Sequence, residues 1–194
     1  MLNPFDRGAA PHPLVVGMTG VKLGERFAQI GCAHGGRLGA IAAKVGLSGR
    51  AVAIVPDQAS AARARKGAAD AGALVEVETA ATTALPVEDN GFDLVVIDDT
   101  AGLLGSMQSD ARDGTVLEAR RILRPGGRLI VIGSARRTGL GALLSRPPAG
   151  VTVDPTPALH AGGFKSVRTL AEREGLTFVE GMKPRPAAGP EPAM

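Results

Sequence analysis

The chain lacks tryptophan and tyrosine, and its 194 residues include only five phenylalanines. A core of ordinary size must therefore be built from Val, Leu, Ile and Ala, which is typical of a parallel sheet covered by helices rich in small residues. The lack of aromatic rings also argues against the stacking platforms that proteins use to bind single-stranded nucleic acid.

The chain has a single cysteine and a small net charge. One cysteine, Cys32, excludes an intramolecular disulfide framework and a zinc site made of several cysteines, and we predict no metal site. A formal charge of +3, from 22 basic and 19 acidic residues, is too weak to indicate a nucleic-acid-binding protein. The sequence contains no apolar run long enough to span a membrane and no signal peptide, so we expect a cytoplasmic protein without a membrane partner. The high Ala, Gly and Arg content is typical of a GC-rich bacterial genome.

Short apolar runs alternate with segments of helical periodicity. Strands are predicted at 27–30, 51–55, 74–77, 92–97 and 129–132, and two further strands at 164–170 and 176–180 form a hairpin. Strands separated by helices predict an α/β fold with a doubly wound, mostly parallel sheet.

The predicted helices have recognisable ends. Apolar residues recur at spacings of three and four from Leu38 to Val45, and a second helix over 58–71 begins after Asp57, a natural N-cap. A third helix over about 113–123 stops at Pro125-Gly126-Gly127. We expect an N-terminal arm over 1–20, with a short helix or turn at 14–21, then a domain over 21–182 and a disordered Pro-rich tail over 183–194.

A glycine-rich turn follows the first predicted strand and reads Gly31-Cys32-Ala33-His34-Gly35-Gly36. In open α/β sheets, ligands bind beyond the carboxyl ends of the strands, where glycines let the backbone approach a ligand. On the pattern alone, a structural turn and a ligand cradle are both open.

From about residue 20 to residue 180, the chain resembles the class I S-adenosylmethionine-dependent methyltransferases. Gly31 and Gly35 match the outer glycines of the family's first motif, and Gly91-Phe92-Asp93-Leu94-Val95-Val96 and Leu123-Arg124-Pro125-Gly126-Gly127 match two later motifs. The resemblance implies the Rossmann-like methyltransferase fold, a seven-stranded sheet whose last strand is antiparallel. It also implies S-adenosylmethionine as the cofactor.

The sequence departs from the family at four ligand positions. Gln29 replaces the first-motif acid, Ala33 replaces the middle glycine, and Val55 replaces the acid that accepts the ribose hydroxyls. Asp57, two residues further on, is either a substitute ribose ligand or only a helix cap. Before Ala84-Leu85-Pro86, where the family often has an acid that contacts the adenine amine, the sequence has Ala81-Thr82-Thr83, and Thr82 or Thr83 is the substitute contact or only a loop residue. Carried over by position, the resemblance assigns cofactor binding to Gln29, Gly31, Cys32, Ala33, His34, Gly35, Val55, Pro56, Asp57, Thr82, Thr83 and Asp98.

Asp98 and His34 are the candidate catalytic residues. Asp98 and Asp99 end the fourth strand, where paired acids bind a cation or act as a general base, or where Asp98 only caps the next loop. His34 is either a base or a polar loop residue, and Cys32 is expected to be structural. Three arginines in the region expected to select the substrate either attract an anionic substrate or lie on a solvated surface: Arg136, Arg137 and Arg146.

Three functions fit these motifs. The first is S-adenosylmethionine-dependent methyl transfer to a small-molecule acceptor. The second is a catalytically inactive relative that binds a protein partner, favoured by the replaced acids. The third is a nucleotide-binding oxidoreductase, because the spacing of Gly31, Ala33 and Gly36 loosely matches a dinucleotide-binding turn. The lack of an acid at the end of the second strand argues against this third function. The acceptor and the oligomeric state are not set by the sequence.

Overall fold

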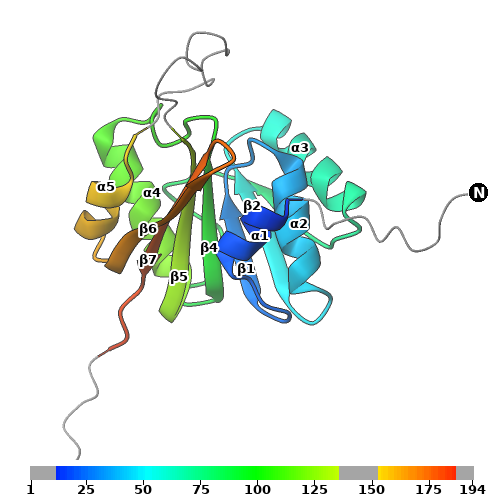
Figure 1. Ribbon diagram of the computed structural model, residues 1–194, viewed down its shortest axis with the longest axis horizontal. Helices are drawn as coiled ribbons and strands as arrows, with labels where there is room; N and C mark the ends of the chain where they lie inside the picture. The colour runs from blue at the N-terminus through cyan, green and yellow to red at the C-terminus, as the bar shows by residue number, and fades with distance from the viewer. Residues whose placement is uncertain (1–11, 136–152, 187–194) are drawn as a thin grey trace, which may run out of the picture.

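The computed structural model describes residues 12–135 and 153–186, which form one mixed sheet between two layers of helices (Figure 1). The strand order is β3-β2-β1-β4-β5-β7-β6. The first five strands pair in parallel, whereas β7 is antiparallel to both β5 and β6. This is the doubly wound sheet with an antiparallel last strand that the sequence predicted. The strands are β1 (Arg26–Ile30), β2 (Arg50–Val55), β3 (Glu76–Thr79), β4 (Phe92–Asp99), β5 (Leu123–Ser134), β6 (Lys165–Arg173) and β7 (Leu176–Met182).

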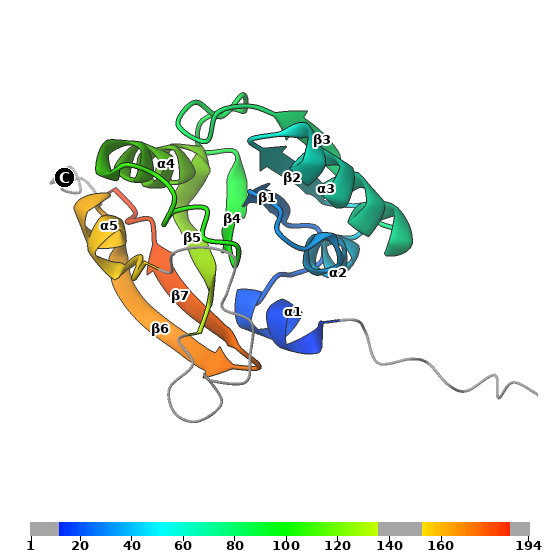
Figure 2. The same ribbon diagram turned by 90° about the horizontal axis from the view of Figure 1, so that it is seen from above.

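Helices cover both faces of the sheet, as Figure 2 shows from above. They are α1 (Pro13–Thr19), α2 (Gly35–Val45), α3 (Gln58–Asp70), α4 (Ser109–Ile122) and α5 (Thr156–Ala161). The helices α1, α2 and α3 lie on one side, and α4 and α5 lie on the other.

Each face of the sheet has its own apolar core because successive strand residues point to opposite faces. On β2, Val52 and Ile54 pack in the core under α4 and α5, whereas Ala53 and Val55 pack in the core under α1, α2 and α3. With apolar residues on both faces, the central strands are the continuous apolar runs that sequence analysis recognises.

Several elements differ in their bounds from those predicted, and three of them show why. The strand predicted at 74–77 lies two residues later, and Leu74 is 76% exposed outside it. Apolar content was misleading there because β3 is an edge strand that exposes Glu76 and Glu78. The helix predicted at 113–123 starts at Ser109, and β5 starts at Leu123 because pairing with β4 begins before the Pro-Gly-Gly turn.

Both ends of the described chain pack on the sheet. Val15 and Thr19 of α1 are buried, and α1 is held by Arg128, whose guanidinium donates to the carbonyl oxygens of Thr19 and Gly20 at 3.0 and 3.1 Å. Lys183 continues β7, with its amide donating to Gly127 at 2.9 Å. Part of the segment predicted as a tail is therefore anchored, whereas 187–194 lie outside the described residues.

Across the described ranges, no helix has the length and apolar character needed to cross a membrane. Among the same residues, no three His, Cys, Asp or Glu side chains are grouped so that they could hold a metal ion.

Candidate functional site

The turn after β1 is held in place by backbone geometry. Gly31 has φ +76°, a left-handed conformation that favours glycine, and its amide donates to the carbonyl oxygen of Ile54 on β2 at 2.8 Å. The side chain of Gln29, which stands where the family has an acid, is buried and donates from Nε2 to the carbonyl oxygen of Gly31 at 2.9 Å. Gln29 therefore braces the turn from inside the protein.

Asp98 connects the turn to β4. One carboxylate oxygen accepts the amides of Ala33 and His34 at 2.9 and 3.3 Å, and the other accepts the hydroxyl and amide of Thr100 at 2.6 and 3.3 Å. Arg37 of α2 in turn donates to the Thr100 hydroxyl at 2.9 Å. Since β1 and β4 are neighbours whose crossover helices lie on opposite faces, Asp98 spans the switch point where ligands of such sheets bind. Both oxygens of Asp98 are engaged within the protein.

Helix α3 presses closely against the turn. A Cβ on Gly35 would lie 2.1 Å from the carbonyl oxygen of Arg63, and one on Gly67 would lie 2.0 Å from that of Gly35. Arg63 donates to the carbonyl oxygen of Cys32 at 3.0 Å. The Cys32 thiol is buried, and burial, followed by the charge of Asp98, raises its pKa to about 11. That thiol is protonated at neutral pH and is therefore a poor nucleophile.

The residues predicted after β2 and β3 have internal partners. Val55 is fully buried, and Asp57 caps α3 by accepting the Ser60 amide at 2.7 Å, which confirms the predicted N-cap. The Ser60 hydroxyl also donates to Asp57, at 3.0 Å, and the hydrogen bonds from the amide and the hydroxyl of Ser60 lower the pKa of Asp57. The buried hydroxyl of Thr82 is hydrogen-bonded to that of Thr115 at 2.8 Å. Pro56 and Thr83 are exposed.

Two side-chain tips occupy the space beside the glycines of the turn. A Cβ on Gly31 would lie 2.7 Å from Cδ2 of Leu103, and one on Gly36 would lie 2.9 Å from Nε2 of His12. His12 stacks edge-on against His34, with ring centroids 5.2 Å apart. Burial, then the neighbouring His34 and Arg37, lowers the pKa of His12. Beside the turn, Nε of Arg37 is buried and has no hydrogen-bond partner in the described part of the chain.

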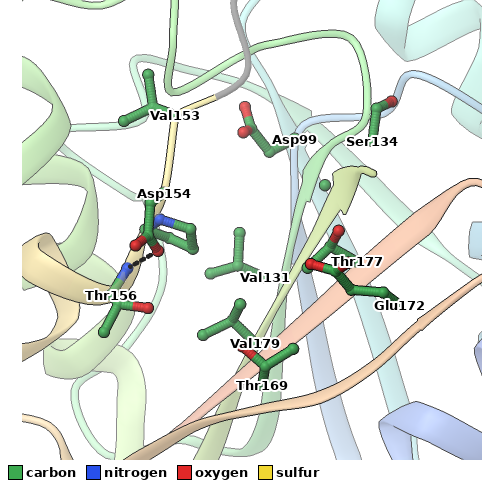
Figure 3. Close-up of a pocket in the computed structure, with 12 residues that line it drawn as sticks. Asp99, Val131, Ser134, Val153, Asp154, Thr156, Thr169, Glu172, Thr177 and Val179 are labelled. Carbon is green, nitrogen blue, oxygen red and sulfur yellow. Dashed lines mark hydrogen bonds between the residues drawn. The ribbon is translucent and has the colours of Figure 1, made fainter. Parts of the chain in front are cut away.

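Asp99 points to the opposite face of the sheet from Asp98 because adjacent strand residues alternate. It lies at a cavity of about 440 Å³, which we call the Asp99 cavity (Figure 3). The described lining residues are Asp99, Val131, Gly133, Ser134, Val153, Asp154, Pro155, Thr156, Thr169, Glu172, Thr177 and Val179.

The carboxyl group of Asp99 is buried, and one of its oxygens accepts the amide of Leu104 at 2.6 Å. The other oxygen has no hydrogen-bond partner among residues 12–135 and 153–186. Burial is the main cause that raises the pKa of Asp99 to about 6; the charge of Asp98 adds to it, and the Leu104 amide and Arg112 oppose it. A carboxyl group poised near neutral pH and open to a cavity is suited to accept a proton from a bound molecule.

The structure brings part of the predicted site together and adds to it. Asp98, Ala33 and His34 meet through hydrogen bonds at the turn, whereas Thr82 and Asp57 are bound to other partners. Leu103, His12 and the lining residues from β6, β7 and 153–156 were missed, because no local pattern marks contacts between distant segments. Strand alternation was the one available signal, since it puts Asp98 and Asp99 on opposite faces. Arg136, Arg137 and Arg146 lie outside the described residues.

Comparison with known proteins identifies the family. The model of the methyltransferase domain family matches residues 28–131. The chain is 37% identical over 130 residues, 67% of its length, to an uncharacterized 37.1 kDa protein in transposon TN4556 of Streptomyces fradiae. It is 29% identical over 175 residues, 89% of its length, to 27-O-demethylrifamycin SV methyltransferase of Amycolatopsis mediterranei. The chain spans only 36% and 59% of the lengths of these two relatives.

Solved structures share the fold. An S-adenosylmethionine-dependent methyltransferase from Aquifex aeolicus superposes with a TM-score of 0.71 at 22% identity, covering 93% of this chain and 94% of that one. The [4+2]-cyclase SpnF superposes with a TM-score of 0.66 at 21% identity, covering 89% of this chain and 79% of that one. The match of the family model to more than half of the chain, together with this fold, shows that the protein belongs to the methyltransferase domain family, whose cofactor is S-adenosylmethionine.

Proposed function

We propose that this chain transfers the methyl group of S-adenosylmethionine to a small molecule bound in the Asp99 cavity, with Asp99 as the general base. The observation that carries the proposal is a buried Asp99 that lines the cavity at the end of β4, with one carboxylate oxygen that has no partner in the described part of the chain, one residue from the Asp98 that holds the glycine turn. The turn and the cavity thus meet at the end of one strand, on its two faces.

The residues at the turn fit the cofactor in two respects. The atoms nearest to Gly31 and Gly36 are mostly side-chain atoms, of Leu103 at Gly31 and of His12 and His34 at Gly36, and side chains can move aside for a ligand more easily than backbone. The buried Nε of Arg37, which has no hydrogen-bond partner among residues 12–135 and 153–186, suits a carboxylate such as that of the methionine moiety. The backbone from Gly31 to Gly36 and Arg37 are the residues we propose to hold the cofactor.

Affinity is expected to be modest. No charged acceptor stands at Gln29 or Val55, and Asp57 is engaged by Ser60. A hydrogen bond to a charged group contributes about 1.5–3 kcal/mol, so each lost acid weakens binding by roughly ten- to a hundredfold. Any displacement of Leu103 and His12 adds to that cost.

In the proposed reaction the protein has two tasks, to orient the acceptor and to remove one proton from it. When bound, the cofactor supplies an electrophilic methyl group on a sulfonium centre. The cavity walls, Val131 and Val179 among them, orient the acceptor and exclude water, and positioning of this kind lowers a large share of the barrier to a two-reactant step. Asp99 takes the proton that the acceptor loses. Its pKa of about 6 leaves it mostly ionised, and so ready to act, above neutral pH.

Two measurements test this function. Isothermal titration with S-adenosylhomocysteine reports cofactor binding, and micromolar affinity is the expected result. Methyl transfer from labelled S-adenosylmethionine to a panel of small molecules, repeated with Asp99→Asn, then tests the base. The variant is expected to keep cofactor affinity and to lose most of kcat, typically a hundredfold or more, since general-base catalysis contributes about 10²–10⁴-fold.

A second function, a binding subunit without catalysis, has its own support. Asp98 already uses the amides of Ala33 and His34, and Leu103 and His12 cover Gly31 and Gly36. The same titration separates the two functions: a folded sample that gives no heat up to millimolar S-adenosylhomocysteine would favour the binding subunit.

A further inference from the structure

The Asp99 cavity has an uneven distribution of charge. Three of the 12 described lining residues are carboxylates, Asp99, Asp154 and Glu172, and none of these twelve is Lys or Arg. The protein as a whole carries a formal charge of +3. The negative charge of the described lining is therefore a local feature and does not follow from overall composition.

The three carboxylates occupy different depths. Asp99 is 3% exposed at the end of β4, whereas Asp154 and Glu172 are exposed at the rim, on the segment before α5 and near the end of β6. Asp154 accepts the amide of Thr156 at 2.9 Å through one oxygen. Within the described residues, neither Asp154 nor Glu172 forms an ion pair.

The remaining lining suits a ligand with one charged end. Val131 and Val179 form an aliphatic surface between the carboxylates, and Thr169 and Thr177 add hydroxyls (Figure 3). The second carboxylate oxygen of Asp99 has no hydrogen-bond partner among the described residues, and it belongs to a buried side chain that lines the cavity. A donor that carries a positive charge satisfies that oxygen best.

From these observations we propose that the Asp99 cavity selects an acceptor with a primary or secondary amine on an apolar body, bound as the ammonium ion. Asp154 and Glu172 attract the cation at the rim, and Asp99 receives the ammonium group inside. This inference rests on the proposed function only for the methylation of the amine, because binding of an amine in the cavity needs no cofactor.

The transfer step then balances. Asp99 takes one proton from the ammonium group, which frees the nitrogen lone pair. The lone pair forms the new nitrogen–carbon bond while the carbon–sulfur bond breaks, and the electron pair of that bond stays on sulfur as the thioether. The product is the N-methylated ammonium ion, and Asp99 passes its proton to water.

Three probes of similar size test the charge preference: 2-phenylethylamine, 2-phenylethanol and 3-phenylpropionate. Their binding to the full chain is measured by ligand-observed NMR without cofactor, at low and at high salt. We expect the amine to bind about tenfold or more tightly than the other two at low salt, with a smaller advantage at high salt because exposed charges are screened.

Variants locate the binding. Asp154→Asn and Glu172→Gln are each expected to weaken amine binding about two- to fivefold, as for exposed ion pairs, and Asp99→Asn about tenfold or more. None should change the affinity for the alcohol. Asp70→Asn, which removes one exposed carboxylate from α3 far from the cavity, is the matched control and should leave amine binding unchanged.

The outcomes are distinct. Equal binding of the alcohol, tighter binding of the carboxylate, or no amine binding up to millimolar concentration would overturn the proposal, and the carboxylate result would instead indicate an anionic acceptor. Amine binding that responds to the three variants, in a protein that does not bind S-adenosylhomocysteine, would support the amine site and overturn only the methyl transfer.

Discussion

Replacing Gly67 by alanine is a sharp test of how the glycine turn is held. A Cβ there would lie 2.0 Å from the carbonyl oxygen of Gly35 and 2.5 Å from its Cα. These separations are roughly 1.5 Å shorter than a van der Waals contact. The obstructing atoms are backbone and cannot rotate away, so α3 must move off α2.

The expected magnitude is a balance of two effects. Alanine in place of glycine inside a helix gains up to about 1 kcal/mol. Overpacking of a tight interface costs about 1–3 kcal/mol and sometimes more, and here it acts on backbone along the whole contact between α2 and α3. We expect Gly67→Ala to lower the free energy of unfolding by about 2 kcal/mol, or Tm by roughly 4–8 °C for a chain of this size.

The assay is urea denaturation followed by far-UV circular dichroism, because the chain has no Trp or Tyr for fluorescence. Gly17→Ala in α1 is the matched control, since a Cβ there meets nothing within 4 Å. It should stabilise the protein by up to about 1 kcal/mol. If Gly67→Ala were as stable as the unmodified chain while Gly17→Ala behaved as expected, the close contact between the helices would be refuted.

Three further predictions concern the site. The pKa of Asp99 is raised to about 6 in the folded chain. The folded state therefore binds a proton more readily than the unfolded state does. The stability that protonated Asp99 provides is present at low pH and is lost as pH rises through 6. Asp98 on the same strand, Arg112 of α4, and Asp154 and Glu172 across the cavity are the other charges near it. Relative to Asp99→Asn, the unmodified protein should therefore lose roughly 2 kcal/mol between pH 4 and pH 7 in denaturation curves, and parallel curves would contradict the burial of this group. The side chain of Asp98→Asn can accept hydrogen bonds on only one side. We therefore expect the free energy of unfolding to fall by about 1–3 kcal/mol and hydrogen exchange to become faster at the amides that follow Cys32. Unchanged exchange would show that Asp98 does not hold the turn. Leu103→Ala removes the tip beside Gly31 and should raise affinity for S-adenosylhomocysteine about three- to tenfold by isothermal titration; an unchanged affinity would mean that Leu103 is no obstacle.

The fold could be predicted from the sequence because its signals are local. The buried strands β1, β2 and β4 are short apolar runs, and Asp57 and Pro125-Gly126-Gly127 mark helix ends within a few residues. The edge strand β3 was displaced in the prediction because an exposed strand has no apolar run of its own.

The site could be predicted only in part, because its contacts join distant segments. Gln29 and Val55 were recognised as replaced acids, but that Gln29 turns inward to Gly31 depends on burial that no motif records. Likewise, Leu103 reaches Gly31 from the loop after β4, and the contact of Gly67 with Gly35 brings two helices together. Such contacts form only when the fold is packed, and no periodic pattern in the sequence marks them.

The alternation of Asp98 and Asp99 along β4 has a consequence for how such a protein can change. One carboxylate maintains the architecture of the turn, and its neighbour faces the cavity from the other side of the sheet. Substitutions on the cavity side, at Thr169 and Thr177 of the hairpin formed by β6 and β7, can therefore accumulate without disturbing the hydrogen bonds around Ala33 and His34. A lineage, or a directed-evolution experiment, can explore new acceptors on one face of the sheet while the scaffold on the other face stays constant.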